Sequence, residues 1–380
     1  MNILYVIPYF NRERGGDVNV CVNIAKKFVK KGHEVTILTT DFELDIDYLN
    51  DTEKNGINLI YFKSVFNVGL FIYSPSMKKW LNKNIQKFDI IHLHTFRAYQ
   101  NNIIQNYSKK YNIPYILQAH GSLLTFFQKS KLKKIYDLLW GHELLKDASK
   151  LIALTESEFG QYQQMGVPEN KIEIVPNGIN LLNYQNLPEK GEFKKKYNIS
   201  NDVIVLLYLG RLHKSKGIDL LMESFAKLLL EYKKVKLVIV GPDDGFLPYL
   251  KLKAEKLKID DKTLFTGPLY GNDKMEAYID SNVFVTPSFS GFPITFLESC
   301  ICGTPIVTTN KMEEITWIDN KVGFVVEYDS EKILRAIVKI LNENLIEEFE
   351  YNSKKIIEER FDESIVIEKL EKIYNKLISN

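Results

Sequence analysis

Short apolar runs alternate with longer segments of helical periodicity along most of this 380-residue chain, and that alternation constrains the fold more than any other feature. The runs are too short for helices and rich in Ile, Val and Leu, as expected for strands buried on both faces. Segments such as Val18–Lys31 place apolar residues at helical spacing between them. Strands that alternate with helices predict parallel sheets covered by helices on both faces. The expected strands are Asn2–Pro8, Glu34–Thr39, Ile57–Phe62, Asp89–Leu93, Tyr115–Ala119, Lys150–Leu154, Ile172–Val175, Val203–Leu209, Val235–Val240, Thr263–Thr266, Val283–Thr286, Pro305–Thr308 and Phe324–Val326.

The alternation occurs twice, and an irregular polar stretch at Leu181–Gly191 separates the two halves. We therefore expect an α/β protein with two doubly wound, Rossmann-like parallel-sheet domains, residues 1–182 and residues 192–361. Ligands of such sheets bind beyond the carboxyl ends of the strands, so a cleft between the facing domains is the expected site. The segment Asp362–Ile378 is predicted to form one amphipathic helix.

Composition excludes several classes of protein. Apolar residues make up 45% and charged residues 26% of the chain, as in soluble globular proteins. No apolar run approaches the ~18 residues of a membrane-spanning helix, and the amino terminus is a poor signal peptide. Three cysteines are too few for a disulfide framework, so a cytoplasmic location is expected. A net charge of +2 argues against nucleic acid as a partner, because phosphate backbones require a strong basic excess.

Charge is unevenly distributed between the two halves. The first 185 residues hold 22 basic and 17 acidic residues, a net +5, and the remainder holds 28 and 31, a net −3. One lysine cluster directly follows an apolar stretch, and it comprises Lys129, Lys131, Lys133 and Lys134 after Leu123, Leu124, Phe126 and Phe127. Such a segment suits contact with an anionic membrane surface, which would make the protein peripheral on the inner face of the membrane. The alternative, a set of solvated helix faces, stays open.

The segment Tyr208–Asp219, YLGRLHKSKGID, carries the clearest chemical pattern. A buried strand ends at Gly210, where the backbone can approach a ligand closely. Arg211 and Lys216 then lie in the loop before a helix. Two cations beside a helix N-terminus form an anion site without a metal, with Arg able to clamp two phosphate oxygens. The alternative is a loop that carries two solvated cations.

A second pattern follows the strand that ends near Thr286. Pro293 suits the first turn of a helix, so the free N–H groups of Ile294 and Thr295 would point at a ligand. Such a helix N-terminus suits a phosphate or a sugar hydroxyl. Glu298 lies about one turn further on, where it can accept hydrogen bonds from a diol. A solvent-facing helical glutamate is the alternative for Glu298.

A third pattern is QAHGSL, in which a strand delivers His120 to the edge of the sheet beside Gly121. His92 and His94 alternate on another strand and point to the same face. The three histidines are a possible metal site. However, no acidic or thiol ligand joins them at a recognisable spacing, so we expect no metal.

Together these segments resemble the glycosyltransferases of the GT-B fold, specifically the large retaining family 4. The resemblance covers nearly the whole chain, and its motifs are the Gly15-Gly16 loop, QAHG, IVPNGI, GRLHKSKGID, LVIVGPDDG, FTGPLYG and the block that ends at Glu298. It implies a first domain that binds the acceptor and a second that binds the nucleotide-sugar donor. It also implies that the last helix, within residues 362–380, packs back on the first domain.

The resemblance also implies roles for individual residues. Arg211 and Lys216 would hold the donor diphosphate, and His120 would lie near the donor sugar; these three are the expected catalytic residues. Glu298 would bind the ribose, and Gly16 would lie near the phosphate. The residues expected to bind the donor are Gly16, Gly210, Pro242, Gly267, Leu269, Ser290, Gly291, Phe292, Pro293, Ile294, Thr295 and Glu298.

One position departs from the family pattern. The family has two glutamates separated by seven residues, and here the first position is Ser290 while the second is Glu298. Serine keeps a hydrogen-bonding group but supplies no carboxylate to the donor sugar. The departure puts the identity of the donor sugar in doubt without removing the diphosphate site.

The resemblance implies an enzyme that moves a sugar from a nucleotide-diphosphate sugar to a hydroxyl of a glycan or a lipid-linked saccharide. Anomeric configuration would be retained, and no metal or other cofactor is expected. Two alternatives stay open. Ser290 motivates a nucleotide-sugar-binding protein without transferase activity, and the similar two-domain fold of some epimerases and phosphorylases keeps those classes open.

Overall fold

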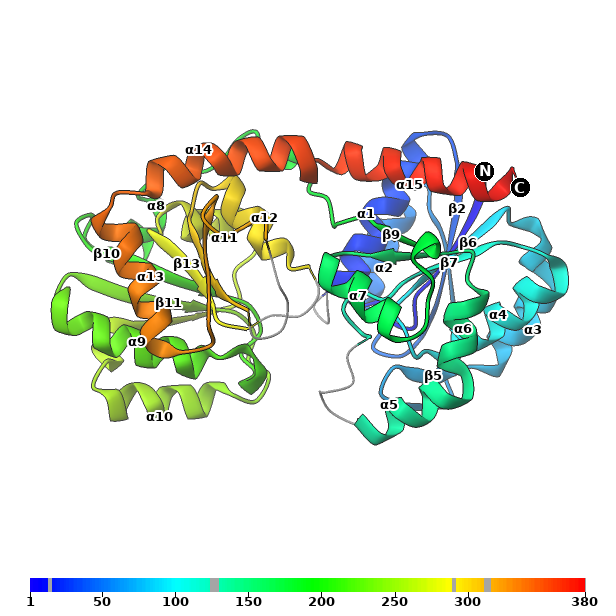
Figure 1. Ribbon diagram of the computed structural model, residues 1–380, viewed down its shortest axis with the longest axis horizontal. Coiled ribbons are helices and arrows are strands. Elements are labelled where there is room, and N and C mark those ends of the chain that lie inside the picture. The colour runs from blue at the N-terminus through cyan, green and yellow to red at the C-terminus, as the bar shows by residue number, and fades with distance from the viewer. Residues whose placement is uncertain (13–15, 124–129, 289–291, 311–315, 380) are drawn as a thin grey trace. The chain divides into compact units, whose positions relative to one another are not determined.

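The computed structural model describes residues 1–12, 16–123, 130–288, 292–310 and 316–379. The chain divides into two compact units, Met1–Asn177 with Ser364–Asn380, and Gly178–Glu363 (Figure 1). The division falls after Asn177, so the polar stretch expected to link the halves belongs to the second unit. Each unit has its own sheet, and the prediction of two Rossmann-like parallel-sheet domains is confirmed.

The first unit contains a seven-stranded parallel sheet of order β3-β2-β1-β6-β7-β8-β9. The order reverses between β1 and β6, which makes this pair the topological switch point. The strands are β1 (Asn2–Val6), β2 (Glu34–Thr40), β3 (Asn58–Phe62), β6 (Ile90–His94), β7 (Tyr115–Gln118), β8 (Lys150–Ala153) and β9 (Ile172–Ile174). Their aliphatic side chains are buried, as continuous apolar strands require, except for the half-buried Ile60 and Ile174 on the edge strands β3 and β9.

The helices of the first unit connect these strands. They are α1 (Gly16–Lys30), α2 (Ile46–Glu53), α3 (Pro75–Asn84), α4 (Tyr99–Tyr111), α5 (Ser130–Tyr136), a π-helical turn η2 (Asp137–Gly141), α6 (His142–Asp147) and α7 (Glu156–Gln164). A small antiparallel hairpin, β4 (Phe66–Val68) and β5 (Phe71–Tyr73), was not expected from the sequence. Its three-residue strands are too short to show a strand pattern.

The last helix, α15 (Glu363–Ile378), contacts the start of the first unit. The Tyr374 ring stacks on Phe28 with the ring centres 5.0 Å apart. Lys31 and His33 both contact the Glu371 carboxylate, at 2.5 and 3.0 Å. Residues from the two ends of the chain therefore share one core. Among the described residues, no helix is long and apolar enough to cross a membrane.

The second unit contains a six-stranded parallel sheet of order β12-β11-β10-β13-β14-β15. The switch point lies between β10 and β13. The strands are β10 (Ile204–Leu209), β11 (Val235–Val240), β12 (Thr263–Gly267), β13 (Val283–Thr286), β14 (Ile306–Thr309) and β15 (Gly323–Val326). The helices are α8 (Glu192–Lys196), α9 (Ile218–Glu231), α10 (Leu247–Leu257), α11 (Gly271–Ile279), α12 (Ile294–Ile301), α13 (Ser330–Asn342) and α14 (Ile346–Ile356).

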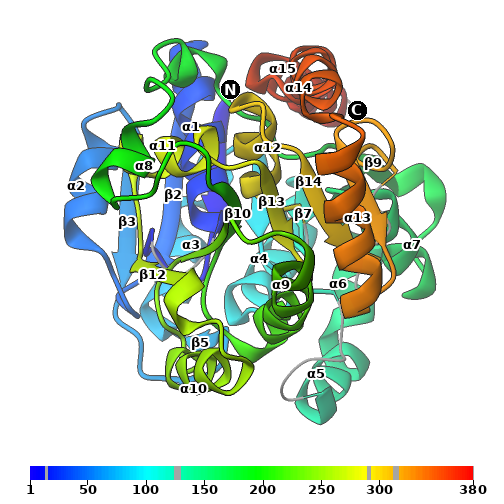
Figure 2. The ribbon, with the colours of Figure 1, turned by 90° about the vertical axis from the view of Figure 1, so that its left-hand side faces the viewer.

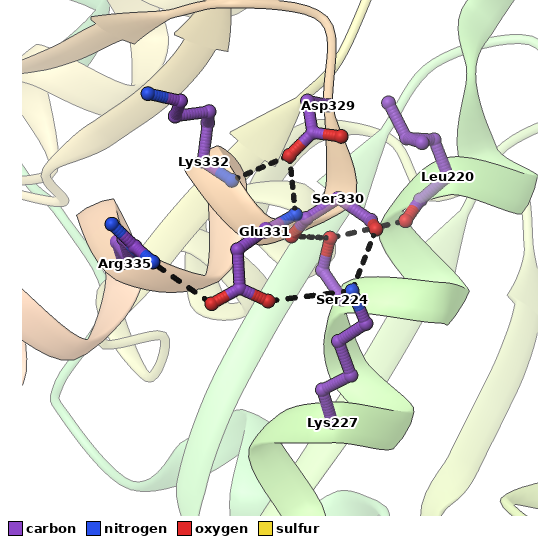
Figure 3. A network of polar contacts seen from close by, with 8 residues as sticks. All are labelled: Leu220, Ser224, Lys227, Asp329, Ser330, Glu331, Lys332 and Arg335. Atoms are coloured by element: carbon purple, nitrogen blue, oxygen red, sulfur yellow. Dashed lines mark hydrogen bonds and ion pairs between the residues drawn. The ribbon is translucent and has the colours of Figure 1, made fainter.

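A polar network joins α9 to the start of α13, and the two helices lie side by side (Figures 2 and 3). Asp329 caps α13 by accepting hydrogen bonds from the N–H groups of Glu331 and Lys332. The Ser224 hydroxyl of α9 donates to the Ser330 carbonyl at 2.8 Å. The network fixes α9, whose N-terminus follows the loop with the two predicted cations.

Candidate functional site

The loops after β10, β11 and β12 meet at the carboxyl edge of the second sheet. The Gly210 N–H donates to the Val240 carbonyl, and the Gly241 N–H donates to the Gly267 carbonyl, both at 3.0 Å. A Cβ atom on Gly241, whose φ is +146°, would lie 1.9 Å from the Gly210 carbonyl oxygen. Only glycine fits there. The structure thus brings together the predicted Gly210 and Gly267, and adds Gly241, which sequence reasoning did not single out.

Pro242 and Leu269 follow these glycines. The Leu212 N–H donates to the Pro242 carbonyl at 2.9 Å, so Pro242 is held beside the loop after β10. Leu269 is half-buried in the segment between β12 and α11. Both lie at the same edge of the sheet as Gly210, where the carboxyl ends of parallel strands meet.

Arg211 projects from the same loop, and its side chain is 51% exposed. Its guanidinium contacts the Asp244 carboxylate at 3.1 Å, while the Tyr208 hydroxyl fixes its backbone by donating to the Arg211 carbonyl at 3.1 Å. An ion pair in contact with water is worth only ~0–1 kcal/mol. A phosphate group can therefore compete with Asp244 for this guanidinium.

Lys216 ends a short 3₁₀ turn, Lys214–Lys216, directly before Gly217 and α9. Gly217 has a φ of +69°, and a Cβ there would lie 3.0 Å from the Pro287 side chain. The loop after β10 therefore packs against the end of β13, across the switch point. Burial, and secondarily the positive charge of Arg211, lowers the pKa of the Lys216 ammonium to about 8.

The environment of Lys216 favours an anion. Among the residues that the structure describes, none forms a hydrogen bond or ion pair with its ammonium. Arg211 is close enough for mutual repulsion to affect the Lys216 pKa. A desolvated cation beside a second cation is stabilised when a negatively charged group binds both. Arg211 and Lys216 therefore lie close enough to interact electrostatically, although the Arg211 side chain is 51% exposed.

Helix α12 begins at Ile294, and Pro293 occupies its N-cap position, one residue before the first turn in which the sequence placed it. Ile294 and Thr295 are half-exposed, and the first N–H groups of any helix lack intrahelical acceptors. The Phe292 ring is buried and stacks on Trp317, with centres 5.9 Å apart. The Phe292 side chain therefore packs inside the second unit. The predicted Ser290 and Gly291 lie outside the described residues.

Glu298 is only 5% exposed, so the alternative of a solvent-facing glutamate is wrong. Its carboxylate contacts the Lys274 ammonium of α11 at 2.5 Å. This pair could not be predicted from the sequence, because 24 residues separate the partners and no local pattern links them. Lys274 neutralises a buried carboxylate that would otherwise be costly to hold inside the protein.

In the first unit, the two predicted residues have different environments. Gly16 is the exposed first residue of α1. His120 is half-buried after β7 and adopts a left-handed backbone conformation with a φ of +52°. Its Nε2 lies 2.9 Å from Nδ1 of His94, and the two rings stack with centres 5.1 Å apart.

The histidine stack continues inward to His92 and to the last helix. The rings of His94 and His92 are 4.3 Å apart and nearly parallel, and His92 Nδ1 lies 2.7 Å from the Tyr374 hydroxyl. Burial lowers the pKa of His92 to about 3 and that of His120 to about 4, and lowers the pKa of His94 well below its ordinary value. The three imidazoles are therefore neutral near pH 7.

His92, His94 and His120 are the three histidines of the possible metal site. Within the described parts of the chain, no three His, Cys, Asp or Glu side chains are placed to hold a metal ion. The rings stack face to face instead of directing their nitrogen atoms at one point.

Glu158 supports the loop that carries His120, and it was not predicted. Its buried carboxylate accepts hydrogen bonds from the N–H groups of Gly121, at 2.8 Å, and Leu154, at 2.7 Å. Burial raises the pKa of this carboxyl to about 7. Glu158 thus ties together the ends of β7 and β8.

Two family models match the chain, one in each half. The model "Glycosyltransferase Family 4" matches residues 14–181, and "Glycosyl transferases group 1" matches residues 189–356. The second match includes every candidate residue described above in the second unit. The first match includes Gly16 and His120.

Relatives of known sequence agree with these matches. An uncharacterized glycosyltransferase of Methanocaldococcus jannaschii is 26% identical over 357 residues, which cover 90% of this chain and 89% of the relative. An Escherichia coli UDP-Gal:alpha-D-GlcNAc-diphosphoundecaprenol alpha-1,3-galactosyltransferase is 25% identical and covers 80% of this chain and 79% of its own.

Among solved structures, Anabaena Alr3699/HepE in complex with UDP matches with a TM-score of 0.81 and 17% identity. The alignment covers 99% of this chain and 100% of HepE. A second structure of HepE contains UDP-glucose. At this level of identity the likeness shows the fold.

Proposed function

Because the chain belongs to the glycosyltransferases of the GT-B fold, with a family 4 domain followed by a group 1 domain, we propose that it is a retaining hexosyltransferase that needs no metal. Its donor is a nucleotide-diphosphate sugar, and its acceptor is a hydroxyl group of a glycan or a lipid-linked saccharide.

The observation that carries the proposal is the pairing of Arg211 and Lys216 at the switch point of the second sheet. One cation is held in a loosely bound ion pair, and the other is desolvated without an anionic partner among the described residues. A donor diphosphate supplies the missing negative charge. Gly241 lets the loops after β10 and β11 approach each other closely, which sets the position of Gly210 beside Arg211.

In the proposed reaction, the bond between the anomeric carbon and the diphosphate oxygen breaks as the acceptor oxygen bonds to the same face of that carbon. The acceptor proton moves to the departing phosphate oxygen. Negative charge grows on the diphosphate in the transition state, and Arg211 and Lys216 stabilise it. Each preorganised contact of this kind is worth ~2–4 kcal/mol.

Other candidate residues have supporting roles. The Glu298 carboxylate binds the ribose hydroxyls, with Lys274 balancing its charge. The N–H groups of Ile294 and Thr295, at the start of α12, donate to phosphate or sugar oxygens. Pro242 and Leu269 border the base.

The first domain contributes neutral groups to the donor. His120 hydrogen-bonds a donor-sugar hydroxyl as a neutral imidazole, because its pKa is about 4. Gly16 allows the start of α1 to approach the phosphate. Ser290 stands where the family has a glutamate, so donor-sugar recognition relies on hydrogen bonds without that carboxylate.

UDP-sugars are the first donors to test, and membrane-linked saccharides the first acceptors. The name of the E. coli relative states both a UDP-sugar and a diphosphoundecaprenol acceptor, and HepE binds UDP and UDP-glucose. Transfer to a lipid-linked acceptor places the enzyme at the cytoplasmic face of a membrane, where we propose that it binds peripherally.

A transfer assay tests the proposal. Purified protein is incubated with a panel of UDP-, GDP-, ADP- and TDP-sugars, with and without EDTA, and with lipid-linked and soluble saccharide acceptors. We expect one donor to yield a glycoside and the free nucleoside diphosphate. NMR of the product should show the donor's anomeric configuration, and EDTA should not change the rate.

Other products would contradict the proposal in distinct ways. An inverted product excludes retention, and loss of turnover in EDTA excludes the metal-independent scheme. Tight donor binding without turnover on any acceptor indicates a binding protein. Conversion of the donor without an acceptor indicates an epimerase, and dependence on inorganic phosphate indicates a phosphorylase.

A further inference from the structure

The first unit carries a concentrated set of exposed apolar side chains on α5 and η2. Leu138 is 80% exposed. The exposed apolar residues of this helical segment are Leu132, Ile135, Leu138, Leu139 and Trp140. Most of them recur at intervals of three or four residues, so they form one helical face. Exposed apolar groups scattered singly are ordinary, but a contiguous set marks a surface that another body covers.

The β4–β5 hairpin extends this surface. The Phe71 ring of β5 lies 6.4 Å from Trp140 and 6.3 Å from Tyr136, centre to centre, so the hairpin packs directly against the helical segment. The hairpin exposes three more apolar side chains, Val65, Phe66 and Val68. Figures 1 and 2 both place α5 and β5 toward the lower end of the first unit. We call these eight exposed residues the apolar surface.

The helical segment is rigidly held, so its exposure does not result from loose packing. Arg97 donates two hydrogen bonds to the Asp137 carboxylate, at 2.8 and 2.7 Å, and both residues are buried. The Tyr136 hydroxyl donates to Asn102 at 2.7 Å. A buried bidentate pair fixes orientation more than it adds stability. The apolar face is therefore presented outward by a fixed helix.

Positive charge accompanies the apolar surface. Lys131 and Lys134 are exposed on α5, and Lys133 lies between them. From residue 130 to residue 142 the sole acidic residue in the sequence is Asp137, which is buried against Arg97. The exposed face of the segment thus combines leucine, isoleucine and tryptophan with lysine and lacks an exposed carboxylate.

We propose that the apolar surface inserts into the interface of an anionic lipid bilayer, with Lys131 and Lys134 contacting the headgroups. Apolar side chains enter the boundary between headgroups and acyl chains, and lysines are attracted to negative headgroups. Tryptophan suits this boundary, because its ring is apolar with one polar N–H. The inference deepens the proposed function by naming where a lipid-linked acceptor is met, yet the binding itself requires no turnover.

Vesicle co-sedimentation of the full chain tests the inference. We compare vesicles of phosphatidylcholine with vesicles of equal parts phosphatidylcholine and phosphatidylglycerol, at low and high salt. The wild-type protein should bind the anionic vesicles at low salt and release from them at high salt. Leu138→Ser/Leu139→Ser should weaken binding ~10–100-fold, because two buried leucines are lost from the lipid. Lys131→Gln/Lys134→Gln should weaken it ~10-fold or more.

A matched control distinguishes binding through this surface from nonspecific hydrophobic binding to vesicles. Leu230→Ser/Leu252→Ser changes two leucines of the second unit that are 76% and 66% exposed, and it should bind as the wild type does. Trp140 fluorescence should shift to the blue on binding, and Trp140→Phe should remove most of that shift, because the chain has only three tryptophans. Thermal unfolding of each variant checks that it is folded. If the leucine variant is unstable, the inference is tested with the lysine variant.

Several results would overturn the inference. They are equal binding to neutral vesicles, no binding at low salt, and equal weakening by the control variant. A concentration-dependent dimer that Leu138→Ser/Leu139→Ser abolishes would instead assign the surface to a second copy. Transfer to a soluble acceptor should be unchanged in the surface variants, so failed vesicle binding with intact transfer rejects this inference alone, and absent transfer with intact binding rejects the proposed function alone.

Discussion

The two units order their strands alike around a switch point, with a seventh strand in the first, but the candidate site residues of the two units differ in charge. The second unit holds charges: Arg211, Lys216 and the Glu298–Lys274 pair. The first unit holds neutral imidazoles, stacked from His120 inward. A shared fold therefore does not determine the charge of a site, which depends on burial and on neighbouring groups.

The ordinary pKa values of lysine and histidine explain why the buried lysine is charged at pH 7 and the buried histidines are neutral. Burial lowers the pKa of both kinds of base, but lysine begins near ~10.4 and histidine near ~6.5. Lys216 therefore keeps its proton at pH 7 with a pKa of about 8, while His120 loses its proton with a pKa of about 4. The second unit is suited to holding an anion, and the first to neutral hydrogen bonds.

The largest expected effect comes from removing the charges of the second unit. Arg211→Ala/Lys216→Ala should reduce kcat/KM for sugar transfer by ~10³-fold or more, at ~2–4 kcal/mol for each contact. Lys214→Ala is the matched control, since Lys214 is an exposed lysine of the same turn. Undiminished turnover in the double variant, measured by release of nucleoside diphosphate, would reject the assigned site.

The next effect concerns the buried ion pair of the second unit. Lys274→Ala leaves the Glu298 carboxylate unpaired and should lower the free energy of unfolding by ~2–3 kcal/mol, less than for a fully buried pair because Lys274 is partly exposed. Lys234→Ala is the control, because its pair with Asp202 has the same 2.5 Å length at the surface, where water screens the attraction, and its loss should leave the stability nearly unchanged.

Trp317 lies in the second unit, so its fluorescence can report the unfolding of that unit in the Lys274 and Lys234 variants. In a Trp80→Phe/Trp140→Phe background it is the only tryptophan left, and its urea unfolding can be followed by fluorescence. Equal losses in the Lys274 and Lys234 variants would show that burial does not strengthen the pair.

Because the buried imidazoles are neutral, we expect the first unit to lose stability as the pH falls. The unfolded chain binds protons at histidine below pH ~6.5, whereas the folded unit resists protonation until about pH 4 or 3. The unfolded state then holds more protons, so stability is complete above pH ~6.5 and falls as pH decreases below it. Each histidine contributes a limiting slope of ~1.4 kcal/mol per pH unit.

Replacing one imidazole should reduce that slope. His94→Gln should remove up to ~1.4 kcal/mol per pH unit from this slope. Urea unfolding of the first unit measures it between about pH 7.5 and about pH 4.5, a range that includes the ordinary histidine pKa and lies above the lowered ones. His142→Gln provides an exposed histidine variant for comparison. A slope identical to that of the wild type would show that His94 is protonated in the folded unit.

The smallest expected effect is the pH dependence of donor binding. The ammonium form of Lys216 binds the diphosphate, so UDP affinity should fall as pH rises above about 8, by at most ~tenfold per pH unit. Lys216→Arg keeps its charge and should give a flat profile between pH 7 and pH 9.5, roughly the range in which lysine alone titrates. Calorimetric titration with UDP measures both. A flat wild-type profile would contradict the lowered pKa.

Much of the fold was predictable, because buried parallel strands are continuous apolar runs and each expected run became a strand. The hairpin β4–β5 was not predicted, because strands of three residues are too short to show the alternation of apolar and polar residues. At the site, the cations and glycines of one loop were visible in the sequence because they are local. Lys274 beside Glu298, and Tyr374 beside His92, join residues far apart in the chain, and only the fold brings them together.

The exposure of the apolar surface also depends on contacts between residues far apart in the sequence, so it could not be predicted. The lysine run expected to contact a membrane overlaps this region of the chain, yet the exposed leucines and Trp140 follow it and look like ordinary core residues in the sequence. Their exposure depends on how α5 and η2 are anchored, through Arg97 and Asp137, which are 40 positions apart.

The contact between Tyr374 and the histidine stack has a consequence for biosynthesis. The ring that stacks on Phe28, and the hydroxyl that contacts His92 Nδ1, lie in a helix that follows the whole second unit along the chain. The second unit is continuous along the chain and can fold during translation, whereas the first stays incomplete until α15 has been synthesised. The half that is synthesised first is therefore the half that matures last.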